Sequence, residues 1–273
     1  MNGACHPYLD HALATALAMA PAGGEAGRVH KLAAWDGAPV LVRQVPGGSA
    51  LDAAGCYPML PFAPHWDVGR GAEELARLGL VSLVFVGDPV LAPPVPGAFD
   101  HARPFKTHHL VRLAAGSYAP SPHHAQEIRR ARRRTVIEEV PFARHLGDWA
   151  TLYGGMLAAK GAGGGIQDLG AGYFMALSRL GVRAFLARSD GVPVAMALWL
   201  RHGSLAYYHL AAGNAEARRV GAAYGLVDEA IRAFIADGVG TIVLGGAAGG
   251  ADAPGSGLAR FKAGFANETA RTM

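Results

Sequence analysis

Lys262 is an unusual choice for this chain, because only four of its 25 lysine and arginine residues are lysines. It lies in the segment SGLARFKAGF, residues 256 to 265, where Phe261 precedes it and Phe265 follows three residues later. A compact ammonium suits a developing oxyanion or a substrate carboxylate better than a planar guanidinium does. Alternatively, the two phenylalanines face the core and Lys262 lies on the exposed face of the same helix.

An arginine run is the second feature that could do chemistry. Five arginines fall within EIRRARRR, residues 127 to 134. At about 100° per residue they cover more than half of a helix circumference and leave the core positions to Ala125, Ile128 and Ala131. Their density favours contact with phosphate groups, for which the candidates are Arg129, Arg130 and Arg133. A solvated helix face is the alternative.

The twelve histidines do not indicate a metal site, because neither H-x-x-x-H nor H-E-x-x-H spacing occurs. A G-x-S-x-G motif and a Cys-His-Asp order are also missing from the sequence, so we expect no covalent nucleophile. An acyl transfer without one needs a deprotonated amine, a bound acyl donor and groups that stabilise the tetrahedral oxyanion.

The composition is that of a globular protein with one large domain or two compact halves, since 51% of the residues are hydrophobic. Cys5 and Cys56 have no C-x-x-C partner, which favours a reducing compartment. The early apolar segment HALATALAMA follows an aspartate and no basic residue, so we do not read it as a signal peptide. No apolar run reaches the roughly 20 residues of a membrane span. We therefore expect a cytoplasmic protein.

Hydrophobic periodicity and turn residues predict a mixed α/β chain. The first half should contain a helix at 7–20, a hairpin turning at Asp36-Gly37, a helix and strand within 71–88, and a strand at 106–114. The second half should contain a helix starting at Ser121-Pro122, a strand at 134–140, helices at 143–160 and 171–180, a three-strand meander within 183–212, a helix at 220–237, a strand at 241–246 and a helix at 257–265.

This order of elements resembles the GNAT superfamily of acyltransferases, and residues 106–265 resemble its FemABX-related branch. The likeness rests on EIRRARRR, on GVPVAMALWLRHGSLAYYHLAA, on the LGG that ends at Gly246, and on LARFKAGF. It implies tandem GNAT-like units with mixed, mostly antiparallel sheets flanked by helices: a degenerate N-terminal unit at 1–115 and an acyltransferase unit at 116–273. Family members usually continue beyond the F-K helix with further strands. Here either the second sheet is smaller or another segment fills the gap.

The segment RRVGAA, residues 218–223, is similar to the GNAT pattern that binds the pyrophosphate of coenzyme A. Gly221 would allow close approach to a helix N-terminus, Arg218 and Arg219 would add charge, and Ala223 completes the pattern. The alternative is a helix start with two solvated arginines. The FemABX branch generally takes aminoacyl-tRNA and does not depend on this loop in the same way.

In GNAT folds the strand that matches LAYYHL borders the reaction centre. Strand alternation would put Tyr207 and His209 on one face and Tyr208 with Leu210 on the other. The resemblance makes His209 a candidate proton acceptor for the incoming amine; a strand histidine bonded to backbone is the alternative. Lys262 and Tyr208 are the other catalytic candidates, and the candidate substrate pocket comprises Phe261, Tyr207, Gly245 and Gly246.

The resemblance thus implies an N-acyltransferase or N-aminoacyltransferase. Its donor would be acyl-coenzyme A or aminoacyl-tRNA, used as a co-substrate, and its acceptor a small-molecule or peptide-like amine that attacks the donor directly in a ternary complex. We expect no metal and no tightly bound cofactor. The alternative is a non-catalytic GNAT-like fold that binds tRNA or another polyanionic ligand.

Overall fold

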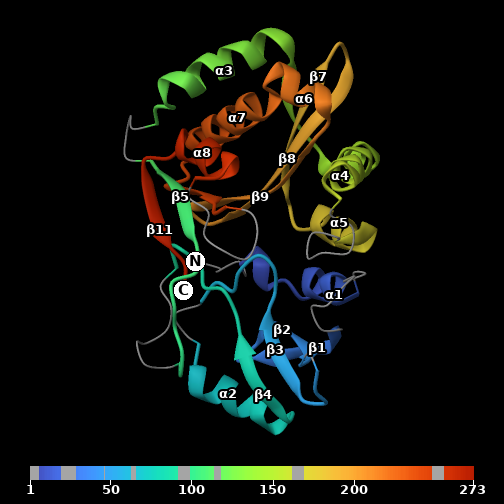
Figure 1. Cartoon of the computed structure of the whole chain (residues 1–273), viewed down its shortest axis with the longest axis vertical. Helices are drawn as coiled ribbons and strands as arrows, with labels where there is room; N and C mark the ends of the chain where they lie inside the picture. Colours follow the sequence, from blue (N-terminus) through green and yellow to red (C-terminus); the bar gives the residue numbers. More distant parts are fainter. Residues whose placement is uncertain are drawn as a thin grey trace. The chain divides into compact units, whose positions relative to one another are not determined.

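A computed structural model gives the fold and describes residues 6–19, 29–45, 47–62, 66–91, 99–113, 118–161, 169–247 and 255–273, with residues 29 and 30 described in backbone only. Cys5 lies outside these ranges. The chain forms two compact units, one of Met1–Phe105, Ala162–Leu177 and Arg271–Met273, and one of Lys106–Gly161 and Ser178–Ala270. Each unit contains a sheet and helices, which confirms the mixed α/β class (Figure 1).

The first unit contains a four-stranded sheet in the order β1-β2-β3-β4, with helices α1 and α2 packed against it. Asp36 and Gly37 form the predicted hairpin turn with φ of 46° and 85°, a conformation that Asp-Gly pairs adopt readily. Strand β3 was not predicted; it pairs antiparallel with β2 and parallel with β4. The elements are η1 (Pro7–Leu9), α1 (His11–Met19), β1 (Val29–Trp35), β2 (Ala38–Gln44), β3 (Leu51–Gly55), α2 (Val68–Arg77), β4 (Leu80–Val84) and α5 (Gly170–Ser178).

The second unit is built on a seven-stranded sheet in the order β11-β5-β10-β9-β8-β7-β6. The predicted meander is confirmed, because β7, β8 and β9 pair antiparallel in sequence, whereas β9 and β10 pair parallel. The strands are β5 (Thr107–Arg112), β6 (Val136–Val140), β7 (Arg183–Ser189), β8 (Val192–His202), β9 (Leu205–Gly213), β10 (Thr241–Gly245) and β11 (Glu268–Arg271).

Strand β5 lies between β10 and β11 in the second sheet. It pairs antiparallel with β10 on the side away from β9, and the unpredicted strand β11 adds to its outer edge. A strand therefore does follow the F-K helix, which the sequence had not predicted, because β11 comes after α8 in the chain. The boundary expected at residue 115 stays a prediction, although β5 lies before it and belongs to the second sheet.

Helices cover both faces of the second sheet. Ala195, Ala197 and Trp199 of β8 belong to the core beneath α7, and the alternating Met196 and Leu198 are buried too. Helix α7 packs against β7 and β8, α3 packs on α7, and α4 contacts β8 and β9 from the other side (Figure 1). The helices are α3 (Pro122–Arg134), η2 (Phe142–His145), α4 (Leu146–Lys160), α6 (Ala215–Val220), α7 (Ala222–Ala236) and α8 (Gly257–Ala263).

The predicted start of α3 is confirmed by its cap. Ser121 is the N-cap, its hydroxyl accepts a hydrogen bond from the backbone N–H of His124 at 3.3 Å, and proline occupies the first turn. The sequence predicted a single helix at 220–237, and the predicted start of this helix is wrong. Gly221 adopts a left-handed conformation with φ of 76°, which ends α6 and begins α7.

None of the helices in the described part of the chain is long and apolar enough to cross a membrane.

Candidate active site

The candidate active site lies where the parallel strands β9 and β10 stop pairing. Their register runs from Leu205 opposite Thr241 to Tyr207 opposite Val243. Beyond this point β9 continues to Gly213, while β10 remains paired with β5 as far as Gly245. Among the described residues the pairing of β9 with β10 thus ends at Tyr207, and we call the place where the two strands part the fork.

Lys262 reaches this fork from α8. Its Nζ donates a hydrogen bond to the carbonyl of Gly246 at 2.7 Å and lies 5.9 Å from the centre of the Tyr208 ring. The residue is only 9% exposed, so the alternative of a lysine on the solvent face of the helix is wrong. Gly245, which ends β10, has a φ of 82° that favours glycine, and a Cβ built on it would lie 3.0 Å from Nζ.

Burial changes the acid–base properties of the site. Burial, and to a smaller extent the positive charge of Lys106, lower the pKa of Lys262 from 10.5 to about 8. Burial also raises the pKa of Tyr208, so the phenol keeps its proton at neutral pH. Near neutral pH the fork therefore presents a mostly charged ammonium beside a protonated phenol.

His209 is the extra residue of a β-bulge. Leu198 pairs with Leu210 and Trp199 with Tyr208, so His209 has no opposite residue on β8. The bulge reverses the alternation, and the expectation that Tyr208 and Leu210 share a face is wrong. Tyr208 instead stacks on Trp199, with ring centres 4.7 Å apart.

Burial lowers the pKa of His209 from 6.5 to about 3, with 7% of the residue exposed. An imidazole of that pKa is neutral at physiological pH but is a very weak base. Its environment therefore does not favour the proton-accepting role, which stays a prediction.

His124 fixes α8 against α3, and sequence reasoning missed it. Its Nε2 is 2.8 Å from the carbonyl of Phe261, which can only accept, so Nε2–H is the donor. The other ring nitrogen lies 3.0 Å from the Ser121 hydroxyl, and the ring packs edge-on against Phe265 at 4.6 Å. Burial lowers its pKa, which favours this neutral form. His124 thereby positions the turn of α8 that carries Lys262.

The predicted donor segment RRVGAA spans the end of α6 and the start of α7. Arg218 and Ala223 are exposed, whereas Arg219 pairs with Glu216 at 2.5 Å. The carboxylate of Glu127 lies against Gly221, where a Cβ would be 3.1 Å from its Oε2. A protein carboxylate thus occupies the space beside the start of α7, and a phosphate there would have to displace or compensate it.

The arginines of the run in α3 differ in their contacts with the rest of the protein. Arg130 donates to Glu127 at 3.1 Å and to the carbonyl of Arg219 at 2.5 Å, so it contributes to packing of the helix. Arg129 is exposed, and Arg133 and Arg134 line an open depression of about 560 Å³. Ile128 and Ala131 are buried as expected, while Ala125 is only half-buried.

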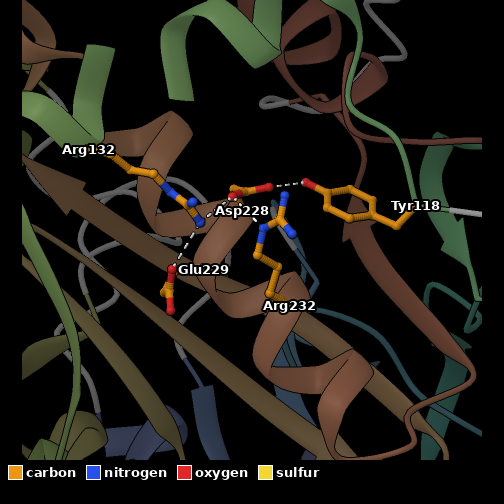
Figure 2. A network of polar contacts seen from close by, with 5 residues as sticks. All are labelled: Tyr118, Arg132, Asp228, Glu229 and Arg232. Atoms are coloured by element: carbon orange, nitrogen blue, oxygen red, sulfur yellow. Dashed lines mark hydrogen bonds and ion pairs between the residues drawn. The ribbon is translucent and has the colours of Figure 1, made fainter. Parts of the chain in front are cut away.

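Arg132 belongs to a structural network (Figure 2). The fully buried carboxylate of Asp228 on α7 accepts hydrogen bonds from Tyr118, Arg132 and Arg232, each at 2.9 Å. Arg132 also reaches Glu229 at 3.3 Å. Burial and then the charge of Asp228 raise the pKa of Tyr118. The network connects α3 to α7, so Arg132 contributes to the stability of the fold.

Lys106 is the other residue that sequence reasoning missed. Its Nζ donates to the carbonyl of Ala247 at 3.2 Å, next to the carbonyl that Lys262 uses. The scarcity of lysine, which singled out Lys262, applies equally to Lys106. Across the described ranges, no group of three or more His, Cys, Asp or Glu side chains could hold a metal ion.

A family profile matches part of the chain. Residues 122–262 match the acetyltransferase (GNAT) domain, which is more than half of the chain. The chain therefore belongs to the GNAT acetyltransferase domain family, and the fold that it shares with FemX is consistent with the FemABX-related branch. No curated protein matches the chain by sequence.

Three solved structures share the fold over nearly the whole chain. FemX is 13% identical with a TM-score of 0.61, covering 94% of this chain and 92% of its own. L-PGS from Bacillus licheniformis is 14% identical with a TM-score of 0.58, covering 98% and 92%. A C-terminal domain of the DUF2156 type from Agrobacterium fabrum is 17% identical with a TM-score of 0.59, covering 90% and 83%.

Proposed function

We propose that the protein is an N-acyltransferase or N-aminoacyltransferase whose reaction takes place at the fork of β9 and β10. The observation that carries the proposal is the buried ammonium of Lys262, held at the fork by Gly246 and the ring of Tyr208. Membership of the GNAT family and a fold shared with FemX support acyl or aminoacyl transfer in general.

The chemistry would be a direct attack within a ternary complex. The amine nitrogen attacks the acyl carbon, and the carbonyl electron pair moves onto oxygen to form an oxyanion. When this intermediate collapses, the bond to the donor breaks, and the coenzyme A thiolate or the ribose oxygen of tRNA takes up the proton that the amine loses. Lys262 would stabilise the oxyanion or orient an anionic group of the acceptor, and Tyr208, which keeps its proton, would lie nearby.

The proposal is tested by mass spectrometry after incubation with acyl-coenzyme A or charged tRNA and a set of amines. Formation of an acylated amine with consumption of the donor supports it. Tight binding of a donor without any product in either reaction would instead establish the non-catalytic alternative, a fold that binds tRNA or another polyanion.

A first variant tests the donor segment with acyl-coenzyme A. Arg218→Ala should raise the KM for the donor about tenfold, as expected when one charge-assisted hydrogen bond is removed, and leave the KM for the amine unchanged. Arg219→Ala should have a smaller effect, because Glu216 already holds that guanidinium. Steady-state kinetics with each substrate varied separately checks both. An unchanged donor KM in Arg218→Ala would remove the segment from the donor site.

A second variant tests the arginine run as a polyanion surface. Changing Arg129 and Arg133 together to glutamine should weaken tRNA binding and reduce the dependence of log Kd on log salt by about one for each phosphate that is no longer neutralised. Arg132→Gln is the matched control, because it should mainly lower the melting temperature through the Asp228 network. Wild-type affinity and salt dependence in the double variant would identify the run as a solvated face.

A further inference from the structure

The amine of Lys262 is a nucleophile in waiting as well as a charge, and its surroundings bear on both roles. Its Nζ donates one hydrogen bond, to the carbonyl of Gly246 at 2.7 Å, and lies 5.9 Å from the centre of the Tyr208 ring. No carboxylate among the described residues pairs with it. The protein therefore buries this amine at the fork without an opposite charge beside it.

Such surroundings favour the uncharged form of the amine. Burial, with a smaller contribution from the charge of Lys106, lowers the pKa of Lys262 to about 8. Near neutral pH a larger fraction of Lys262 than of an ordinary lysine is thus uncharged and nucleophilic. A neutral amine can keep its hydrogen bond to Gly246 through one N–H while its lone pair attacks an electrophile. Conversion of the amine to an amide would remove the cost of burying the charge altogether.

The role proposed for Lys262 also brings its nitrogen within reach of the acyl donor. An ammonium that stabilises the oxyanion lies within hydrogen-bond distance of the acyl oxygen, and the acyl carbon is only about 1.2 Å from that oxygen. Nζ is then close to the separation of about 3 to 3.5 Å at which a nucleophile attacks. When no acceptor occupies the fork, Lys262 is the amine that the fork itself supplies.

We propose that Lys262 is a site of self-acylation, at which the protein takes the acyl group from its own donor when no amine acceptor is bound. The uncharged Nζ attacks the acyl carbon, so that a C–N bond forms and the C–S bond of a thioester or the C–O bond of an aminoacyl ester breaks. The departing sulfur or oxygen takes up the proton that the nitrogen loses. The inference rests on the proposed function, because it needs a donor bound at the fork.

Self-acylation would switch the protein off. The amide at Nζ is neutral and lacks the charge that Lys262 supplies to the oxyanion, so modified protein should lose turnover about as severely as Lys262→Met does. The fraction of turnover lost should therefore follow the fraction of protein that carries the acyl group. Full turnover by fully modified protein would contradict this consequence.

The test follows the mass of the intact protein during incubation with acetyl-coenzyme A and, separately, with aminoacylated tRNA, in both cases without an amine acceptor. Proteolysis and mass spectrometry then locate the acyl group among the four lysines. With one of the donors, Lys262 should be acylated at least about tenfold faster than the exposed Lys160, at a rate that saturates with donor concentration. Lys262→Met should lack this modification, whereas Lys160→Met should retain it.

Three results would overturn the proposal: acylation of Lys262 no faster than that of Lys160, a rate that rises linearly with donor concentration, or no acylation of Lys262 by either donor. The transfer assay with added amines can succeed in each of these cases, because it measures acylated amine and not acylated protein. Failure of self-acylation is thereby distinguished from failure of the proposed function.

Discussion

Lys262→Met is expected to lower turnover at saturating substrates about one hundredfold, a loss of roughly 2.7 kcal/mol in transition-state stabilisation. The side chain is anchored before any substrate arrives, by Gly246 at one side and by the Tyr208 ring at the other. The ammonium is therefore already in position when substrate binds, and no further ordering of the chain is needed. Methionine has similar length and suits a buried site, so the melting temperature should stay close to the wild-type value.

Lys160→Met is the matched control, since this lysine ends α4 and is exposed. It should retain wild-type turnover. Lys262→Arg should not restore activity. A planar guanidinium cannot take the place of a compact ammonium in a site where the lysine is only 9% exposed. Full activity in Lys262→Met, or its failure to fold, would show that the lysine has a structural role only.

Gly264→Ala should lower the free energy of unfolding by about 3 kcal/mol. Gly264 follows α8, and a methyl group on it would overlap the ring of His124. That ring cannot move aside easily, because Ser121, the carbonyl of Phe261 and the ring of Phe265 hold it. Chemical denaturation monitored by circular dichroism measures the loss. Because α8 carries Lys262, turnover should fall as well.

Gly257→Ala provides the comparison at the other end of α8. A Cβ on Gly257 meets nothing within 4 Å, so this variant should be as stable as the wild type or slightly more so. In a Gly264→Ala, His124→Ala double variant the overlap is removed, and the combined loss should be smaller than the sum of the two single losses. Equal stability of Gly264→Ala and the wild type would show that His124 does not fix α8.

Much of the fold follows from local signals. Long periodic segments such as α7 and the β7-β8-β9 meander bury one continuous apolar stripe or face, and that pattern is visible in the sequence. Short strands were missed because their pairing is decided by partners far away. Strand β3 has the sequence LDAAG and β11 has ETAR, and neither contains a clear alternation.

The candidate site was predictable only in part. The scarcity of lysine led to Lys262, but its burial depends on where α8 meets the end of β10, 16 residues earlier in the chain. The bulge at His209 leaves no mark in the alternation of LAYYHL and reverses the expected faces. His124 was missed because its distant neighbours, Phe261 and Phe265, are brought to it only when α8 packs against α3.

The pH dependence of turnover tests most directly whether the Lys262 ammonium acts in the reaction. Because its pKa is lowered to about 8, Lys262 loses its charge as the pH rises through that value. Turnover of the wild type at saturating substrates should therefore fall above pH 8, and the low residual turnover of Lys262→Met should lack that decline. The same decline in both proteins, or none in the wild type as the pH rises through that pKa of about 8, would contradict the assignment of Lys262 to the reaction centre.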